Sequence, residues 1–454
     1  MNELREALLE EAQRALPAAD LDDVYRRADA RARRSRRVAT AVVLSLAVAV
    51  AGSAMVAAHQ ARSSQRVLSL PPPAQGALPG GSATTASAAA STVPAVPGVG
   101  PPAGPVPSGF AAASVTFVSD TEGWVLGTAR CPGHPCTSVL RTTDGGSSWV
   151  GIPAPSAPLQ DHGSSTASIS AIRFADPSNG FAFGPALWST HDGGRSWHED
   201  ASVGGIGPYW VLSLVTTPGD VYALVAGLDP VHGGFGGHVR LVSGPVKGDS
   251  FQVIADFGAG QGYPYRLIQA GSTAFAVGHR LYSVTGSTVT ALSLPTASCN
   301  QLAASSPTAL LVVCGGGVAM GGMGQRSVYG SVTGGRTWTR LPDPGQGSGY
   351  DPAGVADNGG GHAVIGTVSQ FASGLLATSN GGRTWAQVLV FTGDRNGGFA
   401  DLAFEDARHG VVINGPRRAL LMQGPAGQPL GPGEGTLYRT DDGGLTWHLL
   451  HFGA

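Results

Sequence analysis

The chain has 454 residues with a formal net charge of −2, 13 % charged residues, 69 glycines and 32 prolines. A balance this close to neutral excludes the global basic field by which many proteins hold nucleic acid. The shortage of charge and the excess of glycine argue against a helix-rich enzyme and favour many short strands joined by tight turns.

Residues 1–37 are predicted to form a cytoplasmic tail with short helices. Apolar residues recur with helical spacing over residues 2–16, and a second helix is predicted after Asp20. Arginines crowd the end of this tail, at Arg26, Arg27, Arg31, Arg33, Arg34, Arg36 and Arg37. Two interpretations stay open: a solvated tail that ends in an arginine stop, or a helix pair that docks a cytoplasmic regulator.

Residues 38–58 read VATAVVLSLAVAVAGSAMVAA and contain no charge. Such a segment is long enough to cross a hydrocarbon core of ~30 Å as a transmembrane helix. Because the arginines precede it, the positive-inside rule places the N-terminus in the cytoplasm and the remaining chain outside. The alternative is a cleaved export signal, since SRRVAT (35–40) partly resembles a twin-arginine signal. Both interpretations export the C-terminal part.

Residues 59–109 are predicted to be a disordered linker. Proline, alanine, glycine and serine dominate, and residues 68–109 carry no charge at all. A segment of this composition cannot bury a core, so it is expected to act as a tether.

All four cysteines lie beyond the apolar segment, which suggests disulfides in an exported domain. Of the three pairings that four cysteines allow, we expect the two local ones, Cys131–Cys136 and Cys299–Cys314. A metal site at Cys131, His134 and Cys136 is not expected, because the spacing does not fit a zinc knuckle and a fourth ligand is missing.

An eight-residue box recurs five times between residues 110 and 454: TTDGGSSW (142–149), THDGGRSW (190–197), SVTGGRTW (331–338), TSNGGRTW (378–385) and TDDGGLTW (440–447). Each box follows a strand pattern, and a strand–turn–strand pattern stands upstream in seven places. Two further boxes have decayed, VSGPVKGDSF (242–251) and YSVTGSTV (282–289). Four short strands per unit and seven units predict an all-β fold, a seven-bladed β-propeller over residues 110–454.

The box predicts a tight turn between the third and fourth strands of a blade. Its acidic residue is expected to accept hydrogen bonds from its own turn and from the leading Thr or Ser, its glycines to permit positive φ, and its tryptophan to bury a large ring. Asn380 and Thr333 replace the aspartate in two boxes; asparagine is expected to preserve the turn, and threonine less well. The predicted structural residues are Thr142, Asp144, Gly146, Trp149, Thr190, Asp192, Gly194, Trp197, Ser331, Thr333, Gly335, Trp338, Thr378, Asn380, Gly382, Trp385, Thr440, Asp442, Gly444 and Trp447.

This pattern resembles the Asp-box (BNR) repeat of sialidases and related propellers. The longer unit, with an F-x-D/S-x-x-x-G-F/W element ahead of the box, is similar to the photosystem II assembly and stability factor family and its bacterial relatives. The resemblance covers about 345 residues, those from Phe110 to the end of the chain. It implies a propeller whose boxes are structural and whose role is the assembly of membrane complexes, without implying photosynthesis.

Catalysis has weak support in the sequence. The resemblance implies that an active sialidase would carry an arginine triad, a Tyr/Glu nucleophile pair, an aspartate acid/base and an early F/Y-R-I/L-P motif. The nearest match, YPYRLIQ (263–269), is mid-chain and lacks the proline. A glycosidase needs two carboxylates that face one cleft, and the acidic candidates are expected to be solvated residues of turns or strand edges: Asp176, Asp401, Glu405 and Asp406.

Two long insertions, 227–239 and 389–398, are expected on one face, either as binding loops or merely as long loops. The first contains His232 and His238, for which no metal role is expected. Three arginines share one box position and are expected to solubilise the turns or to form an exposed basic row: Arg195, Arg336 and Arg383.

These features predict a single-pass, N-in membrane protein whose propeller is extracytoplasmic and which needs no cofactor and no metal. The predicted function is non-catalytic: binding or scaffolding of a protein or glycan of the cell envelope. The alternative is a sialidase-like glycoside hydrolase. A third hypothesis is a transmembrane sensor in which the cytoplasmic tail reports what the propeller binds.

Overall fold

The computed structural model describes residues 104–131, 135–159, 166–207, 209–227, 238–258, 264–297, 299–315, 326–344, 351–359, 361–368, 372–392, 397–416 and 435–452. The predicted tail (1–37), transmembrane helix (38–58) and most of the linker lie outside these residues. Within the described part, no helix is long and apolar enough to span a membrane.

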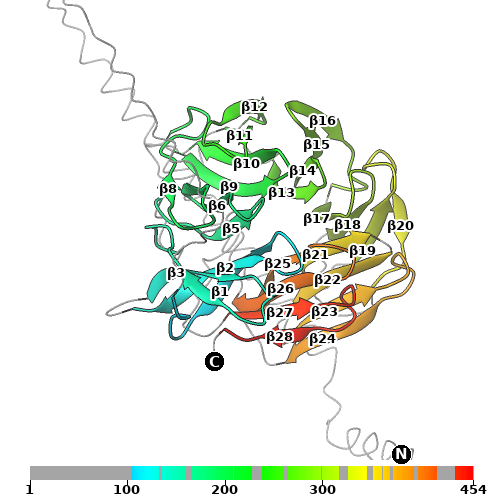
Figure 1. The fold of residues 1–454 in the computed structure, drawn as a ribbon. Coiled ribbons are helices and arrows are strands. Elements are labelled where there is room, and N and C mark those ends of the chain that lie inside the picture. The colour runs from blue at the N-terminus through cyan, green and yellow to red at the C-terminus, as the bar shows by residue number, and fades with distance from the viewer. Residues whose placement is uncertain are drawn as a thin grey trace, which may run out of the picture. The chain divides into compact units, whose positions relative to one another are not determined.

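Seven four-stranded antiparallel sheets follow one another along the chain and form a ring, so the predicted seven-bladed β-propeller is confirmed (Figure 1). Blade 1 contains β1 (Ala111–Phe117), β2 (Gly123–Arg130), β3 (Pro135–Thr142) and β4 (Val150–Ile152). Blade 2 contains β5 (Ala171–Phe174), β6 (Gly180–Phe183), β7 (Leu187–Thr190) and β8 (His198–Glu199). Blade 3 contains β9 (Tyr209–Thr216), β10 (Asp220–Gly227), β11 (Val239–Pro245) and β12 (Gln252–Asp256). Blade 4 contains β13 (Pro264–Ala270), β14 (Thr273–Gly278), β15 (Leu281–Thr285) and β16 (Thr288–Leu292).

The remaining three blades repeat this plan. Blade 5 contains β17 (Cys299–Ala304), β18 (Leu310–Gly315), β19 (Arg326–Ser331) and β20 (Thr339–Leu341). Blade 6 contains β21 (Asp351–Gly359), β22 (His362–Val368), β23 (Ala372–Thr378) and β24 (Ala386–Thr392). Blade 7 contains β25 (Gly397–Phe404), β26 (Gly410–Pro416), β27 (Thr436–Thr440) and β28 (His448–Leu450). Both predicted disulfides are confirmed, Cys131–Cys136 and Cys299–Cys314.

The first strands of the seven blades, β1, β5, β9, β13, β17, β21 and β25, contact one another around the whole circle, and we call them the inner ring. In six of them the pairing with the second strand shifts register within the strand, which marks a β-bulge. A bulge sharpens the local twist and re-aims the side chain beside it. The bulges therefore decide which side chains point toward the centre of the ring.

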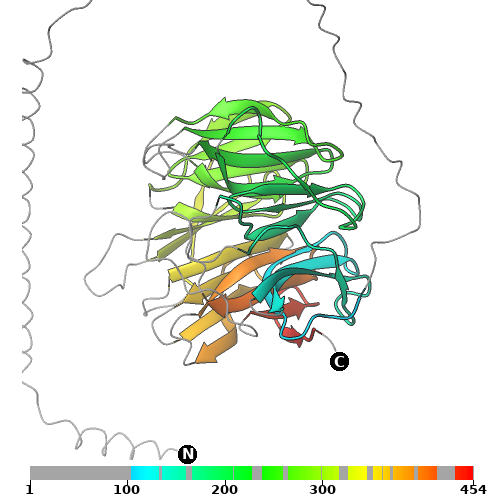
Figure 2. The same ribbon diagram turned by 90° about the vertical axis from the view of Figure 1, so that its left-hand side faces the viewer.

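The hydrophobic core is divided into seven layers, and each layer lies between two neighbouring blades. The layer between blades 7 and 1, the closing seam, packs Trp149 and Leu437 with Leu450 and Phe452. Figure 1 and Figure 2 both show the cyan strands of blade 1 beside the orange and red strands of blade 7. No strand is exchanged between the described sheets of these two blades, so the ring is closed by side-chain packing together with hydrogen bonds such as that from the Ala112 N–H to the Gly435 carbonyl (3.2 Å).

The segment ahead of β1 joins this closure. Gly104 and Gly151 exchange two backbone hydrogen bonds of 2.8 and 2.9 Å, and Val106 packs into the closing seam. The ring of Phe110 meets that of Phe452 edge-on, with centroids 5.0 Å apart. Among the described residues, Gly104 and Val106 thus already contact the propeller.

Each box forms the turn between the third and fourth strands, with one set of hydrogen bonds. In blade 1 the Thr142 hydroxyl donates to Asp144 (2.8 Å) and accepts the Gly146 N–H (2.9 Å), while Asp144 accepts the N–H of Ser148 (2.9 Å). The same three bonds recur in the boxes of blades 2, 6 and 7. In blade 5 the hydroxyls of Ser331 and Thr333 are 3.3 Å apart, so this bond is longer where threonine replaces aspartate.

The boxes also join neighbouring blades, which the sequence did not predict. A Cβ added at Gly194 would lie 2.8 Å from the side chain of Ile152, the last residue of β4, and one added at Gly382 would lie 2.8 Å from Leu341, the last residue of β20. The indole N–H of Trp197 donates to the carbonyl of Pro153 in blade 1 (3.0 Å). The boxes of blades 2, 5 and 6 thus pack against the outer strand of the preceding blade, whereas the blade 7 box, at Gly444, faces Val364 on the second strand of blade 6.

The closing seam uses the same contact, which leads to a stability prediction. Gly146 lies against Leu450, the last residue of β28, so Leu450→Ala removes the side chain on which the first box rests. We expect this change to lower the free energy of unfolding by about 1–3 kcal/mol, measured by urea denaturation. Leu449→Ala is the matched control because Leu449 is 40 % exposed; equal losses in the two variants would contradict the proposed contact.

Candidate functional site

Polar side chains from non-neighbouring blades meet at the centre of the inner ring. Arg173 of blade 2 pairs with Asp401 of blade 7 (Nη2–Oδ1 2.6 Å). Arg266 of blade 4 donates from Nη1 to Oε1 of Gln301 in blade 5 (2.6 Å). Asp401 and Arg173 both act electrostatically on Arg266, and blades 2, 4 and 7 can reach one another only across the centre of the ring.

Asp401 has a strained backbone and a fully occupied carboxylate. Its φ is 48°, in the left-handed region; the other described residues with positive φ are all glycines. Oδ2 accepts the Ser114 hydroxyl (2.5 Å) and the Val115 N–H (2.9 Å), while Oδ1 accepts Arg173. The bulge between Ala400 and Ala403 therefore aims this carboxylate at blade 1 and blade 2.

The bond from Val115 to Asp401 belongs to a recurring arrangement. The first strand of each blade is an edge strand, so part of its N–H groups has no partner within its own sheet. The hydroxyl of Ser114 accepts the Ile172 N–H of the next blade (3.1 Å), and that of Ser213 accepts the Leu267 N–H of the next blade (3.0 Å). A side-chain oxygen beside a bulge thus satisfies an N–H of the following blade.

Asp401 is ionised in this setting. Burial by itself would raise its pKa, but the charge of Arg173 and the hydrogen bonds from Arg173, Ser114 and Val115 outweigh burial and hold the pKa below the usual value. A carboxylate that stays ionised and has both oxygens occupied is not suited to donate a proton. Its role is to neutralise Arg173.

Arg266 is the cation of this cluster whose hydrogen-bond partner, among the described residues, is not a carboxylate. Its hydrogen-bond partner, Gln301, is neutral and buried, and Asp401 is bound to Arg173. Burial lowers the pKa of Arg266, yet a guanidinium does not give up its proton in proteins. Among the described residues, the centre of the inner ring therefore carries two arginines and one carboxylate, with an excess of positive charge.

The sequence predicted only part of this central cluster. Arg266 lies within YPYRLIQ, the segment noted for its partial match to the arginine motif, whereas Arg173 and Gln301 carried no recognisable signal. The expectation that Asp401 is a solvated turn or edge residue is wrong, because 14 % of its side chain is exposed and its charge is paired. Asp176 does cap its own turn, through the N–H groups of Ser178 and Asn179.

The other candidates lie away from this cluster. Cys131 and Cys136 are joined in a disulfide, so they are not metal ligands, and no group of three potential ligands for a metal occurs among the described residues. His238 pairs with Asp256 at 2.9 Å, while His134, His232 and most of the two long insertions lie outside the described part. Arg336 donates to the carbonyl of Thr333 within its own box.

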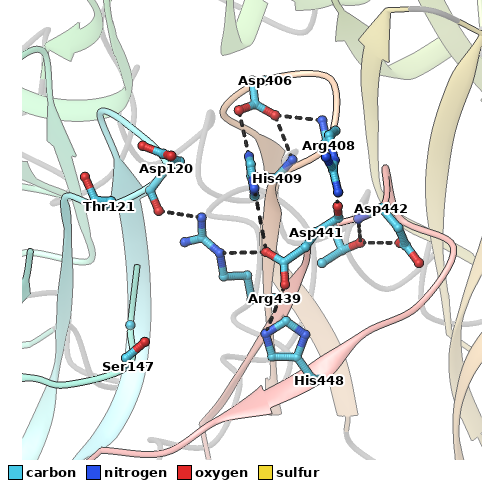
Figure 3. A network of polar contacts seen from close by, with 12 residues as sticks. Asp120, Thr121, Ser147, Asp406, Arg408, His409, Arg439, Asp441, Asp442 and His448 are labelled. Atoms are coloured by element: carbon cyan, nitrogen blue, oxygen red, sulfur yellow. Dashed lines mark hydrogen bonds and ion pairs between the residues drawn. The ribbon is translucent and has the colours of Figure 1, made fainter. Parts of the chain in front are cut away.

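A second polar network bridges the closing seam where the boxes lie (Figure 3). Arg439, 3 % exposed, donates from Nη2 to the carbonyl of Asp120 in blade 1 (2.8 Å) and lies over the ring of Phe117. Asp441 faces Arg439 at 3.5 Å and His448 at 3.7 Å. The guanidinium thereby connects the third strand of blade 7 to the first turn of blade 1.

Glu405 lies close to this network and was expected to be solvated, which is wrong for its carboxylate. Both carboxylate oxygens are buried without a hydrogen-bond partner in the described structure. Burial raises the pKa of Glu405 to about 7, and the charge of Arg439 offsets only part of that rise. The closing seam thus contains a carboxyl group that favours its neutral form.

No protein-family model and no curated protein matches the sequence. Among solved structures, the chain is similar to YCF48 bound to a D1 peptide (TM-score 0.49, 16 % identity, 75 % of this chain and 96 % of that one). It is similar to YCF48 from Cyanidioschyzon merolae (TM-score 0.45, 15 % identity, 75 % and 98 %). The GH74 enzyme of Niastella koreensis also matches (TM-score 0.44, 14 % identity, 75 % and 59 %). At these identities the likeness concerns the propeller fold alone.

The pairing of Asp401 with Arg173 yields a prediction. Asp401→Asn tolerates the left-handed backbone and still accepts the Val115 N–H, but it leaves Arg173 unpaired. We expect a loss of about 2–4 kcal/mol in the free energy of unfolding. Adding Arg173→Gln should cost less than the sum of the two single changes; additive losses would show that the pair is not coupled.

The raised pKa of Glu405 predicts that the stability of the protein depends on pH. The folded-state pKa of Glu405, about 7, lies above its unfolded value. The stability that the protonated side chain contributes is therefore complete at low pH and is lost as the pH rises through about 7. Glu405→Gln should therefore raise the melting temperature at pH 8, on the order of a few degrees, and leave it nearly unchanged at pH 5. Glu122→Gln, which removes the partner of Arg141, is the control and should lower stability at both pH values. A Glu405→Gln effect that does not change with pH would contradict the raised pKa.

Proposed function

We propose that this protein is an exported, membrane-tethered binding protein whose propeller holds a carboxylate-bearing partner of the cell envelope at the inner ring, without catalysis. The observation that carries the proposal is Arg266, a partly desolvated guanidinium on a first strand whose hydrogen-bond partner, Gln301, is neutral. A guanidinium in such a place favours an anion, and a carboxylate matches its planar fork with two parallel hydrogen bonds.

Because Asp401 neutralises Arg173, Arg266 is the arginine that we expect to bind the carboxylate of the partner. Asp401 fixes Arg173 in an ion pair of 2.6 Å, so an incoming carboxylate would compete there with a carboxylate already in place. Arg266 offers its charge without that competition. Gln301 leaves this charge intact while it orients the guanidinium through Nη1.

Export and tethering are the second part of the proposal. Two disulfides in the propeller support an oxidising compartment. The apolar segment 38–58 and the arginines before it are the sequence features that would hold the protein in the membrane with its N-terminus in the cytoplasm. The cytoplasmic tail would then be free to engage a regulator.

The sialidase-like hydrolase is less well supported by the described geometry. It would need a third arginine and a carboxyl group able to donate a proton, while the inner ring brings together Arg173, Arg266 and an Asp401 that is held ionised. The same arginine could recognise an acidic protein segment or a carboxylated glycan. An acidic protein segment is the partner we favour, because the resemblance to assembly factors implies a protein.

The test is capture from native membranes with the full-length chain. Arg266→Gln should reduce the recovery of a partner at least about tenfold, the loss expected when a desolvated carboxylate–guanidinium pair is removed. Arg336→Gln, which removes an exposed arginine of a box, is the matched control and should capture as well as wild type. Protease treatment of the membranes before capture separates a protein partner, which is lost, from a glycan, which persists. Full capture by Arg266→Gln would overturn the proposed site.

A further inference from the structure

His191, the second residue of the blade 2 box, lies between two blades and contacts an acceptor with each ring nitrogen. Nδ1 is 2.8 Å from Oδ1 of Asn179, in the first turn of its own blade. Nε2 is 3.0 Å from Oδ1 of Asp249, in the turn between β11 and β12 of blade 3. The imidazole therefore connects blade 2 to blade 3.

The orientation of the Asn179 amide is fixed by a third residue. Its Nδ2 donates to both oxygens of Asp176, at 3.0 and 2.8 Å, and the Asn179 side chain is buried. Turning the amide over would place its oxygen against the Asp176 carboxylate, so the flip is unfavourable. The group that faces Nδ1 of His191 is consequently an oxygen.

Both partners of His191 are hydrogen-bond acceptors, so both ring nitrogens must donate. A neutral imidazole has one N–H, and only the imidazolium has two. We propose that His191 is a proton-dependent clamp, which in its imidazolium form fastens blade 2 to blade 3 through Asn179 and Asp249. Loss of one proton leaves one of the two contacts without a donor.

The clamp stands where a contact that joins two other pairs of blades cannot form. In blades 2 and 5 the box tryptophan donates its indole N–H to a carbonyl of the preceding blade, from Trp197 to Pro153 and from Trp338 to Ser293. The box of blade 3 has decayed, and Phe251, which has no N–H, occupies the tryptophan position. Asp249, two residues earlier, receives a hydrogen bond from His191 in place of that contact.

Several charged groups lie around the imidazole. Asp249 faces it directly, and Asp176 stands behind Asn179. His198 on β8 acts on Asp249 with positive charge, and Asp200 acts on it with negative charge. The hydrogen bond from His191 holds the pKa of Asp249 below its usual range, although burial opposes that effect. The carboxylate side of the clamp therefore stays charged in mild acid.

The pH dependence follows from the two groups. The clamp is complete where the carboxylate is ionised and the imidazole carries both protons, and it is lost when the imidazole gives up one of them. The contact between blades 2 and 3 should consequently be strongest in mild acid and weaker above neutral pH. Envelope acidification would tighten the ring at this place.

Two measurements on the full-length chain test the clamp. With 15N-labelled histidine, long-range proton–nitrogen spectra should show both ring nitrogens of His191 protonated at pH 5.5, with the signal assigned by its absence in His191→Asn. Thermal unfolding should show His191→Asn and Asp249→Asn each lowering the melting temperature at pH 5.5 by about 2–4 °C, with a smaller loss at pH 8 for His191→Asn. The double variant should lose less than the sum of the two.

His238→Asn is the matched control, because the partner of His238 among the described residues is Asp256, which lies in the same blade. It should change the melting temperature by less than His191→Asn at pH 5.5. A single protonated nitrogen on His191 at pH 5.5 would overturn the proposal. So would a His191→Asn loss of the same size at pH 5.5 and pH 8, since the contact would then not depend on the proton.

Discussion

The ring depends on how the N–H groups of its inner edge strands are satisfied. An open edge strand invites pairing with another chain, and a propeller places seven such edges side by side. Here oxygens of Ser114, Ser213 and Asp401 accept N–H groups of the following blade. The β-bulges next to these residues turn the side chains into position. Polar side chains in the centre of the ring therefore have a structural role, whether or not they also bind a ligand.

Packing between blades supplies the rest of the stability, because each core layer belongs to two blades. A box turn satisfies its own backbone and also rests on the outer strand of the blade before it, as Gly194 does on Ile152. Losing a box therefore weakens a contact between blades and not just a turn. The closing seam has no shared strand, and the buried Arg439 adds a polar bridge to its packing. Where a box contact between two blades is missing, another group has to join the blades at the same place.

The blades could be predicted from sequence because their signals are local. Eight consecutive residues determine a box turn, and strand patterns stand upstream of it in the same unit, so five clear boxes and two decayed ones predicted the number of blades. The central cluster has no such signal, since Ser114, Arg173 and Asp401 meet only after the ring closes. Residues in similar sequence contexts, such as Asp176 and Asp401, end in different environments.

The charge of the inner ring connects the fold to binding. Asp401 is needed at the closing seam to accept the Val115 N–H, and its charge requires a cation, which Arg173 provides. This pair is therefore accounted for by the architecture. Arg266 joins blade 4 to blade 5 through Gln301, but this partner is neutral, and burial penalises the positive charge of the guanidinium. This positive charge, placed where seven blades converge and opposite a neutral partner, is the feature on which the proposed binding of an anion rests.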